Sequence, residues 1–255
     1  MTPDIRQLPP PTADVRLPYG SDALQFGDLR LPEGNGPHPV AVVIHGGFWR
    51  SAYNLEHIGH LCAALTAAGI ATWSLEYRRV GDIGGGWRNT VEDVARGADH
   101  VKTLAGEYPT DSQRVIAVGH SAGGHLALML AARKRVGGAV SLAGVADLHR
   151  AWELRLGNDA VASFLGGSPE ELPDRYEQAS PRALLPLGVP QRLVHGAKDT
   201  VVPLEISDTY VKAAREAGDD AELIVLPQAG HFEVIDPRSA EWPEVMQIIA
   251  SLCGL

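Results

Sequence analysis

The chain has 255 residues, of which 45% are hydrophobic and 21% are charged, an ordinary globular composition that excludes disorder for the bulk of the chain. A chain of this length buries about three quarters of its unfolded surface, so we expect one domain over residues 1–255. The formal net charge of −9 opposes the attraction to phosphates on which nucleic-acid binding depends, and it argues against nucleic acid and anionic membranes as partners.

The amino-terminal part of the chain predicts a hairpin and no targeting signal. Residues 1–15 lack the basic segment and the run of about 7–15 apolar residues that a signal peptide needs. No apolar run reaches the ~18 residues that cross a bilayer, so we expect a soluble cytoplasmic protein. Over residues 13–31, apolar and polar residues alternate loosely around Gly20 and Ser21, which predicts a short antiparallel hairpin.

From residue 40 onward, short apolar runs alternate with helical patterns. The runs are too short for helices and too uniformly apolar for half-exposed strands, so they indicate buried parallel strands. These strands are expected at 40–44, 70–75, 114–118, 139–142, 192–194 and 223–226. The helical patterns lie at 55–68, 90–106, 122–133, 203–217 and 242–252. The alternation predicts an α/β fold with a mostly parallel central sheet and helices on both faces.

A segment without strands interrupts this alternation, and two cysteines lie within its helical stretches. Residues 147–187 contain no strand pattern and are dense in Pro, Gly and charged residues, which predicts a small helical cap inserted over the sheet. Cys62 and Cys253 each lie in an apolar helical stretch, so we expect buried free thiols rather than a disulfide.

A candidate nucleophile follows the strand at 114–118. Gly119-His120-Ser121-Ala122-Gly123 stands between this strand and a helical run, the context of a nucleophile elbow. Glycines are needed there because neighbouring chain comes so close to the turn that side chains would collide. Ser121 is therefore expected at the top of the sheet, with its hydroxyl exposed to a substrate.

A serine hydroxyl needs a base, and the base needs an orienting carboxylate. Asp199 lies in the loop after the strand at 192–194, and His231 lies in the loop after the last strand. The carboxyl ends of parallel strands meet at one edge of a sheet, so Ser121, Asp199 and His231 are expected to form a catalytic triad. Asp147 also follows a strand and is the alternative acid, although capping of the next helix is the favoured interpretation.

The loop after the first central strand predicts an oxyanion hole. It reads His45-Gly46-Gly47-Phe48-Trp49, and its two glycines let backbone amides turn toward the nucleophile. We assign the amides of Gly47, Phe48 and Ala122 to the hole and expect His45 to brace the loop by hydrogen bonding.

Together, HGGFW, GHSAGG, the Asp199 loop and Gly230-His231 resemble the α/β-hydrolase superfamily, closest to its esterase and kynurenine formamidase (arylformamidase) branch. The segments 143–148 and 179–181 also look like that branch. The resemblance covers roughly residues 40–232 and implies the α/β-hydrolase fold with the same triad. It says little about the substrate.

Aromatic residues in loops and in the insertion are candidates for a substrate pocket. Trp49, Trp87 and Trp152 are the residues we assign to it, with core packing as an equally weighted alternative for each. His57 and His60 lie one helical turn apart, but no carboxylate or cysteine cluster accompanies them, so no metal is expected. The triad chemistry requires no cofactor.

The function indicated is a serine hydrolase that cleaves small carboxylic esters or aryl formamides through an acyl-enzyme on Ser121. Within enzymes, a carbohydrate-ester deacetylase, a feruloyl esterase or a peptidase stays open, because a fold does not fix a substrate. Outside enzymes, the alternative is a catalytically silent ligand-binding module. The expected partner is a small-molecule substrate, and the oligomeric state stays open, a homodimer included.

Overall fold

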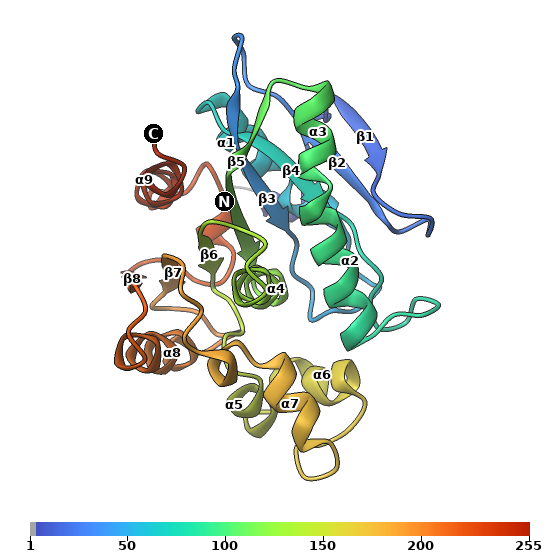
Figure 1. The fold of residues 1–255 in the computed structure, drawn as a ribbon. Coiled ribbons are helices and arrows are strands. Elements are labelled where there is room, and N and C mark those ends of the chain that lie inside the picture. Colours follow the sequence, from blue (N-terminus) through green and yellow to red (C-terminus); the bar gives the residue numbers. More distant parts are fainter. Residues whose placement is uncertain (1–3) are drawn as a thin grey trace.

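The apolar runs of the sequence form the interior of an eight-stranded sheet in a computed structural model that describes residues 4–255 (Figure 1). The strand order is β1-β2-β4-β3-β5-β6-β7-β8. The strands are β1 (Val15–Pro18), β2 (Phe26–Arg30), β3 (His38–Ile44), β4 (Ala71–Leu75), β5 (Thr110–His120), β6 (Ala139–Leu142), β7 (Gln191–Gly196) and β8 (Ala221–Leu226).

The sheet is mostly parallel, as predicted. Strands β3 to β8 all run in one direction, whereas β1 and β2 pair antiparallel, with Val15 opposite Leu29. The hairpin predicted over residues 13–31 is therefore confirmed. Because the six parallel strands end at the same edge, the loops after β3, β5, β7 and β8 are brought together there.

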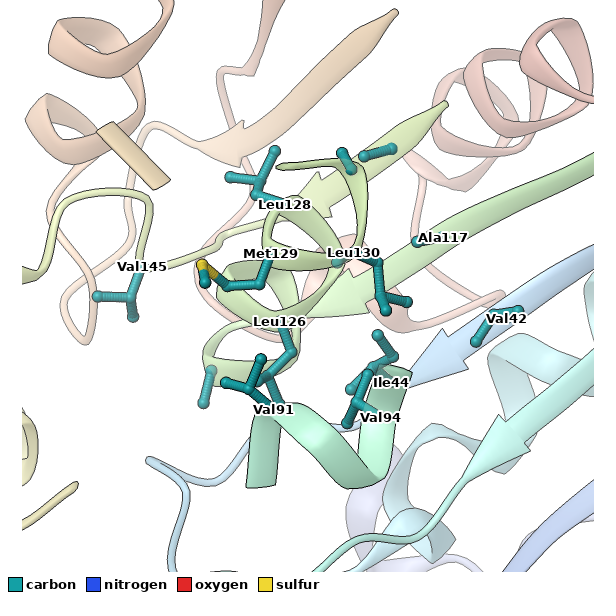
Figure 2. Close-up of a cluster of buried hydrophobic side chains, with 14 of the residues drawn as sticks. Val42, Ile44, Val91, Val94, Ala117, Leu126, Leu128, Met129, Leu130 and Val145 are labelled. Carbon is teal, nitrogen blue, oxygen red and sulfur yellow. The ribbon is translucent and has the colours of Figure 1, made fainter. Parts of the chain in front are cut away.

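Helices cover both faces of this sheet. Successive residues of β3 point to opposite faces, so Val40 and Val42 join one buried cluster while Ala41 and Val43 join the other. The first face is covered by α2 (Trp87–Asp99), α3 (Val101–Glu107), α4 (Ala122–Ala132) and α8 (Leu204–Glu216). The second face is covered by α1 (Gly59–Ala67) and α9 (Trp242–Leu252). Figure 2 shows side chains of α2, α4 and β3 meeting in the first cluster.

Two predicted helices are divided in the structure. The pattern at 55–68 begins with a 3₁₀ helix, η2 (Leu55–Ile58), before α1; the Asn54 side chain caps η2 by accepting from the amide of Glu56. The pattern at 90–106 divides into α2 and α3 at His100, which keeps nearly helical backbone angles. Such a break leaves the apolar periodicity intact, which is why the sequence does not reveal it.

The insertion between β6 and β7 is helical. It contains α5 (Leu148–Glu153), α6 (Leu156–Leu165), α7 (Pro173–Ala179) and the 3₁₀ helix η3 (Pro181–Leu184), which gather beside one end of the sheet (Figure 1). Asp147 caps α5, accepting from the amide of Arg150 at 3.0 Å.

Cys62 and Cys253 are free and buried, as predicted. Over residues 4–255, no helix combines the length and apolar character needed to cross a membrane.

Candidate active site

Ser121 occupies a strained turn between β5 and α4. Its backbone lies at φ 57° and ψ −118°, a conformation that non-glycine residues adopt only when their surroundings impose it. A Cβ on Gly119 would lie 2.0 Å from the carbonyl oxygen of Gly123, and one on Gly123 would lie 2.1 Å from that of Ile44. The steric reason predicted for the two glycines therefore holds, and the turn matches a nucleophile elbow.

The structure brings Asp199 and His231 into direct contact. Nδ1 of His231, in the loop after β8, lies 2.7 Å from Oδ2 of Asp199, in the loop after β7. When Nδ1 donates to this carboxylate, the neutral ring keeps Nε2 as its basic nitrogen. Asp147 instead caps α5 and pairs with Arg182 at 3.3 Å, so Asp199 is the carboxylate that contacts the histidine.

Asp199 is held by more than His231. Its Oδ1 accepts from the amides of Val201 at 2.8 Å and Val202 at 2.9 Å, and Nε2 of His195 lies 3.3 Å from Oδ2. Burial by itself raises the pKa of Asp199, but the hydrogen bonds from His195, His231 and the Val202 amide outweigh it and lower the pKa below its ordinary value. His195 is a residue whose supporting role the sequence did not reveal.

Ser121 and His231 line one cavity of about 550 Å³. The two residues are 3% and 6% exposed, so the reacting groups are largely shielded from bulk water. Further residues on the wall come from the loop after β3, from η2, from the loops after β7 and β8, and from the amino-terminal segment. They are Arg6, Gly47, Phe48, Ala52, Tyr53, Asn54, Glu56, His57, His120, Val201 and Phe232.

Two predicted oxyanion donors lie on this wall. Gly47 and Phe48 have positive φ angles of 110° and 52°, and within residues 4–255 their amides have no hydrogen-bond acceptor. Ala122 is the first residue of α4, where an amide has no partner inside the helix. Unpaired amides near a serine hydroxyl are suited to stabilise a developing negative charge.

His45 braces the oxyanion loop, as expected from the sequence. Its Nδ1 contacts the carbonyl oxygen of Gly46 at 2.8 Å, and its Nε2 lies 3.0 Å from Oε1 of Glu76. Glu76 also pairs with Arg79 at 3.0 Å and accepts from the amide of Leu55. Both Glu76 and Arg79 follow β4, and neither was singled out in the sequence, because only the fold brings this segment behind the loop.

The three predicted pocket tryptophans do not line the cavity at Ser121. Trp49 is buried, stacks on Phe164 at 4.6 Å and donates from Nε1 to Nδ1 of His125 at 3.3 Å. Trp87 lines a separate cavity of about 340 Å³ beside α6, and half-buried Trp152 packs against the first hydrophobic cluster. The positive φ of Trp49, 55°, turns its side chain into the core, a reversal that the sequence pattern does not show.

His57 and His120, beside the cavity, are neutral packing groups. Burial and the neighbouring His45 lower the pKa of His57 to about 4, and burial with His231 and His57 lowers that of His120 well below its ordinary value. His57 Nδ1 contacts the carbonyl oxygen of Asn54 at 2.9 Å. In the part of the chain that the structure describes, no group of three His, Cys, Asp or Glu side chains could hold a metal ion.

The sequence profile of one family, BD-FAE, matches residues 28–213. The chain is 26% identical over 265 residues to isoprenylcysteine alpha-carbonyl methylesterase ICME of Arabidopsis thaliana, and 25% identical over 244 residues to esterase LipC of Mycobacterium tuberculosis. These matches cover 92% and 87% of the chain, which spans 60% of the length of each relative.

The fold is also similar to that of a solved protein, a truncated carbohydrate esterase from gut microbiota. The two share a TM-score of 0.83 and 21% sequence identity, over 97% of this chain and 100% of the other. The likeness confirms the predicted α/β-hydrolase fold.

Proposed function

Because the chain belongs to the BD-FAE family of α/β-hydrolase esterases, we propose that it hydrolyses small carboxylic esters through an acyl-enzyme on Ser121. The observation that carries this proposal is the 2.7 Å contact between His231 and Asp199 beside the cavity that Ser121 lines. Asp199, His231 and Ser121 follow three different strands, so only the folded sheet brings them together.

The proposed reaction proceeds in two halves. His231 Nε2 takes the proton of the Ser121 hydroxyl while Oγ attacks the ester carbonyl, and Asp199 stabilises the imidazolium. The amides of Gly47, Phe48 and Ala122 donate to the oxyanion. The imidazolium then gives its proton to the leaving alcohol as the C–O bond breaks. Water, deprotonated by His231, releases the acid and restores Ser121.

A catalytically silent ligand-binding module is the less favoured alternative. Ser121, Phe48 and Trp49 all have positive φ angles, and such conformations cost about 1–3 kcal/mol each. A module that only binds a ligand gains nothing from holding a serine and two loop residues in this way. The strain is understandable if these residues position a nucleophile and its oxyanion donors.

The cavity favours a compact substrate. At about 550 Å³ it is of ordinary size for a small-molecule site, and the insertion contributes no residue to its lining. A long acyl chain would therefore find apolar wall only over the few loop residues of this cavity, such as Phe48, Val201 and Phe232. Tyr53, Asn54 and Glu56 on the rim can hydrogen-bond to hydroxyl groups, which favours an acylated sugar as the second candidate substrate.

A substrate panel tests the proposal. We expect p-nitrophenyl acetate and butyrate to exceed the decanoate by at least about tenfold in kcat/KM, because each methylene that fits adds only ~0.8 kcal/mol and one that does not fit adds strain. Acetylated and feruloylated sugars and N-formylkynurenine complete the panel and separate ester from formamide preference. Activity that rises through decanoate, or that Ser121→Ala retains at a tenth of the wild-type value, contradicts the proposal.

A further inference from the structure

The amino-terminal segment, not the helical insertion, supplies one wall of the cavity. Residues 5–7 form a 3₁₀ helix, η1 (Ile5–Gln7), in which Ile5 is buried and anchors the segment. The next residue, Arg6, lines the cavity together with Ser121. Its guanidinium carbon lies 3.6 Å from the ring centroid of Phe232, so the charged group rests on an aromatic face at the mouth of the site.

Arg6 has a free edge for a ligand. Nε and Nη2 contact the carboxylate of Asp4, with both Nε–O distances at 3.0 Å, whereas Nη1 has no acceptor among residues 4–255. The side chain is 39% exposed, and exposed ion pairs of this kind contribute only about 0–1 kcal/mol. An incoming anion can therefore bind Nη1 without a large penalty from Asp4.

Arg6 also supplies the basic charge on the described wall of the cavity. It is the one Lys or Arg among the described lining residues. His57 and His120 are uncharged at neutral pH because burial lowers the pKa of each. Glu56 on the same wall carries a negative charge, and it also lines a second cavity with Arg16, whose pKa it helps to raise. Arg6 is thus the cationic group that an anionic ligand would meet in this cavity, against the opposing charges of Asp4 and Glu56.

The position of Arg6 indicates which part of a substrate it meets. In the proposed reaction, His231 delivers its proton to the leaving oxygen, so the leaving group lies on the histidine side of the site. Phe232 follows His231 directly, and its ring contacts the His231 ring at 4.9 Å between centroids. Arg6 lies over this same Phe232 ring. The guanidinium therefore faces the alcohol part of the ester and not the acyl part.

We propose that Arg6 is a specificity-determining residue that binds a carboxylate on the leaving alcohol, so that hydroxy acids or uronic acids acylated on a hydroxyl group, with their carboxylate free, are the preferred substrate class. This inference rests on the proposed function. A planar carboxylate pairs well with a guanidinium edge, and the Phe232 ring beneath keeps that edge in place.

The test compares substrates that differ only in charge. The acetate esters 3- and 4-acetoxybenzoate carry a carboxylate on the leaving group, and 3- and 4-acetoxybenzamide are their neutral isosteres. For each enzyme variant, the measured quantity is the ratio of kcat/KM for the charged ester to that for the neutral ester. Intrinsic differences in reactivity cancel when this ratio is compared between variants.

We expect the ratio to fall by roughly three- to tenfold in Arg6→Gln, since part-exposed charge pairs contribute little more. It should fall further in Arg6→Glu, recover in part in Arg6→Lys, and rise in Asp4→Asn, which removes the competing carboxylate. Arg155→Gln is the matched control, because Arg155 forms the same two-oxygen pair with Asp159 on the insertion and does not line the cavity. Added salt should lower the wild-type ratio and affect Arg6→Gln less.

Different failures have different meanings. If wild type and Arg6→Gln give the same ratio while Ser121 remains essential for both esters, this inference is wrong and the proposed function stands. If the ratio responds only for a carboxylate on the acyl side, as in mono-p-nitrophenyl succinate against p-nitrophenyl butyrate, the assignment to the leaving group is wrong. If the wild type cleaves none of these esters, the proposed function fails and this inference fails with it.

Discussion

At the scale of single residues, Asp199 is the best supported member of the site. Two backbone amides and two histidines converge on its carboxylate, and together they lower its pKa despite burial. A carboxylate held ionised in this way can fix the tautomer of His231 and stabilise its charged form. Asp147 has the ordinary surroundings of a helix cap, with one backbone amide and one exposed arginine.

We therefore expect Asp199→Asn to reduce the catalytic rate and Asp147→Asn to affect only stability. Asp199→Asn should reduce kcat by about 10³–10⁴ because His231 loses its orienting carboxylate. Asp147→Asn should leave turnover nearly unchanged and lower the free energy of unfolding by less than the ~0.5–2 kcal/mol of a lost cap, because Asn caps a helix about as well as Asp. Steady-state kinetics and urea unfolding of both variants check this; the reverse ranking would move the acid to the end of β6.

At the scale of elements, the oxyanion loop, residues 45–49, is a strained segment that side-chain contacts with neighbouring elements hold in place. Three consecutive residues, Gly47 to Trp49, have positive φ angles. His45 ties the start of this loop to Glu76, and the Trp49 side chain ties its end to His125. The loop is thus positioned by one partner just after β4 and one on α4 rather than by its own sequence.

Gly47→Ala tests this positioning. The backbone of Gly47 lies at φ 110°, and an added Cβ would lie 2.4 Å from Cβ of Tyr53, so the loop must shift. Displacing a single oxyanion donor costs about 10²–10³ in kcat, and we expect a loss of this size with a smaller effect on KM. Gly106→Ala in α3 is the control, because nothing lies within 4 Å of its added Cβ and the rate should not change.

The sequence predicts the parts of the site that short sequence patterns determine, and it does not predict the parts that depend on contacts between distant segments. The elbow at Ser121 and the strand ends carrying Asp199 and His231 are local patterns, and the structure places Ser121 and His231 on one cavity and Asp199 in contact with His231. Trp49 was assigned to the pocket wrongly, since a left-handed turn sends its ring into the core. The contact of Arg6 with Phe232 joins opposite ends of the chain, which no local pattern records, so the sequence does not place Arg6 at the cavity.

At the scale of the whole molecule, buried neutral histidines join separate parts of the fold. His125 on α4 accepts from Trp49 Nε1 through Nδ1 and contacts the carbonyl oxygen of Ala179 through Nε2 at 2.8 Å. A neutral ring with its proton on Nε2 satisfies both partners. Burial lowers its pKa to about 4, so the oxyanion loop and the insertion are connected by a group that resists protonation.

This arrangement makes stability depend on pH. Between the ordinary histidine pKa of 6.5 and about 4, the unfolded chain binds a proton at His125 that the folded chain does not, so stability is full above pH 6.5 and falls as the pH drops toward 4. His125→Gln should make the decline shallower by up to about 1.4 kcal/mol per pH unit. Urea unfolding from pH 8 to 4.5 measures this, with equal slopes above pH 7 as the internal control. An unchanged slope below pH 6.5 would show that His125 protonates in the folded state.

The most direct measurement of the central claim is the identity of the covalent intermediate. Wild-type protein mixed rapidly with p-nitrophenyl acetate should release a burst of p-nitrophenol, and acid quenching followed by peptide mass analysis should place one acetyl group on Ser121. The same experiment with Ser121→Ala should give no burst and no adduct while the variant unfolds at the same temperature. An acetyl group on another residue that turns over at the rate of the reaction, or hydrolysis without any covalent adduct, would contradict the account.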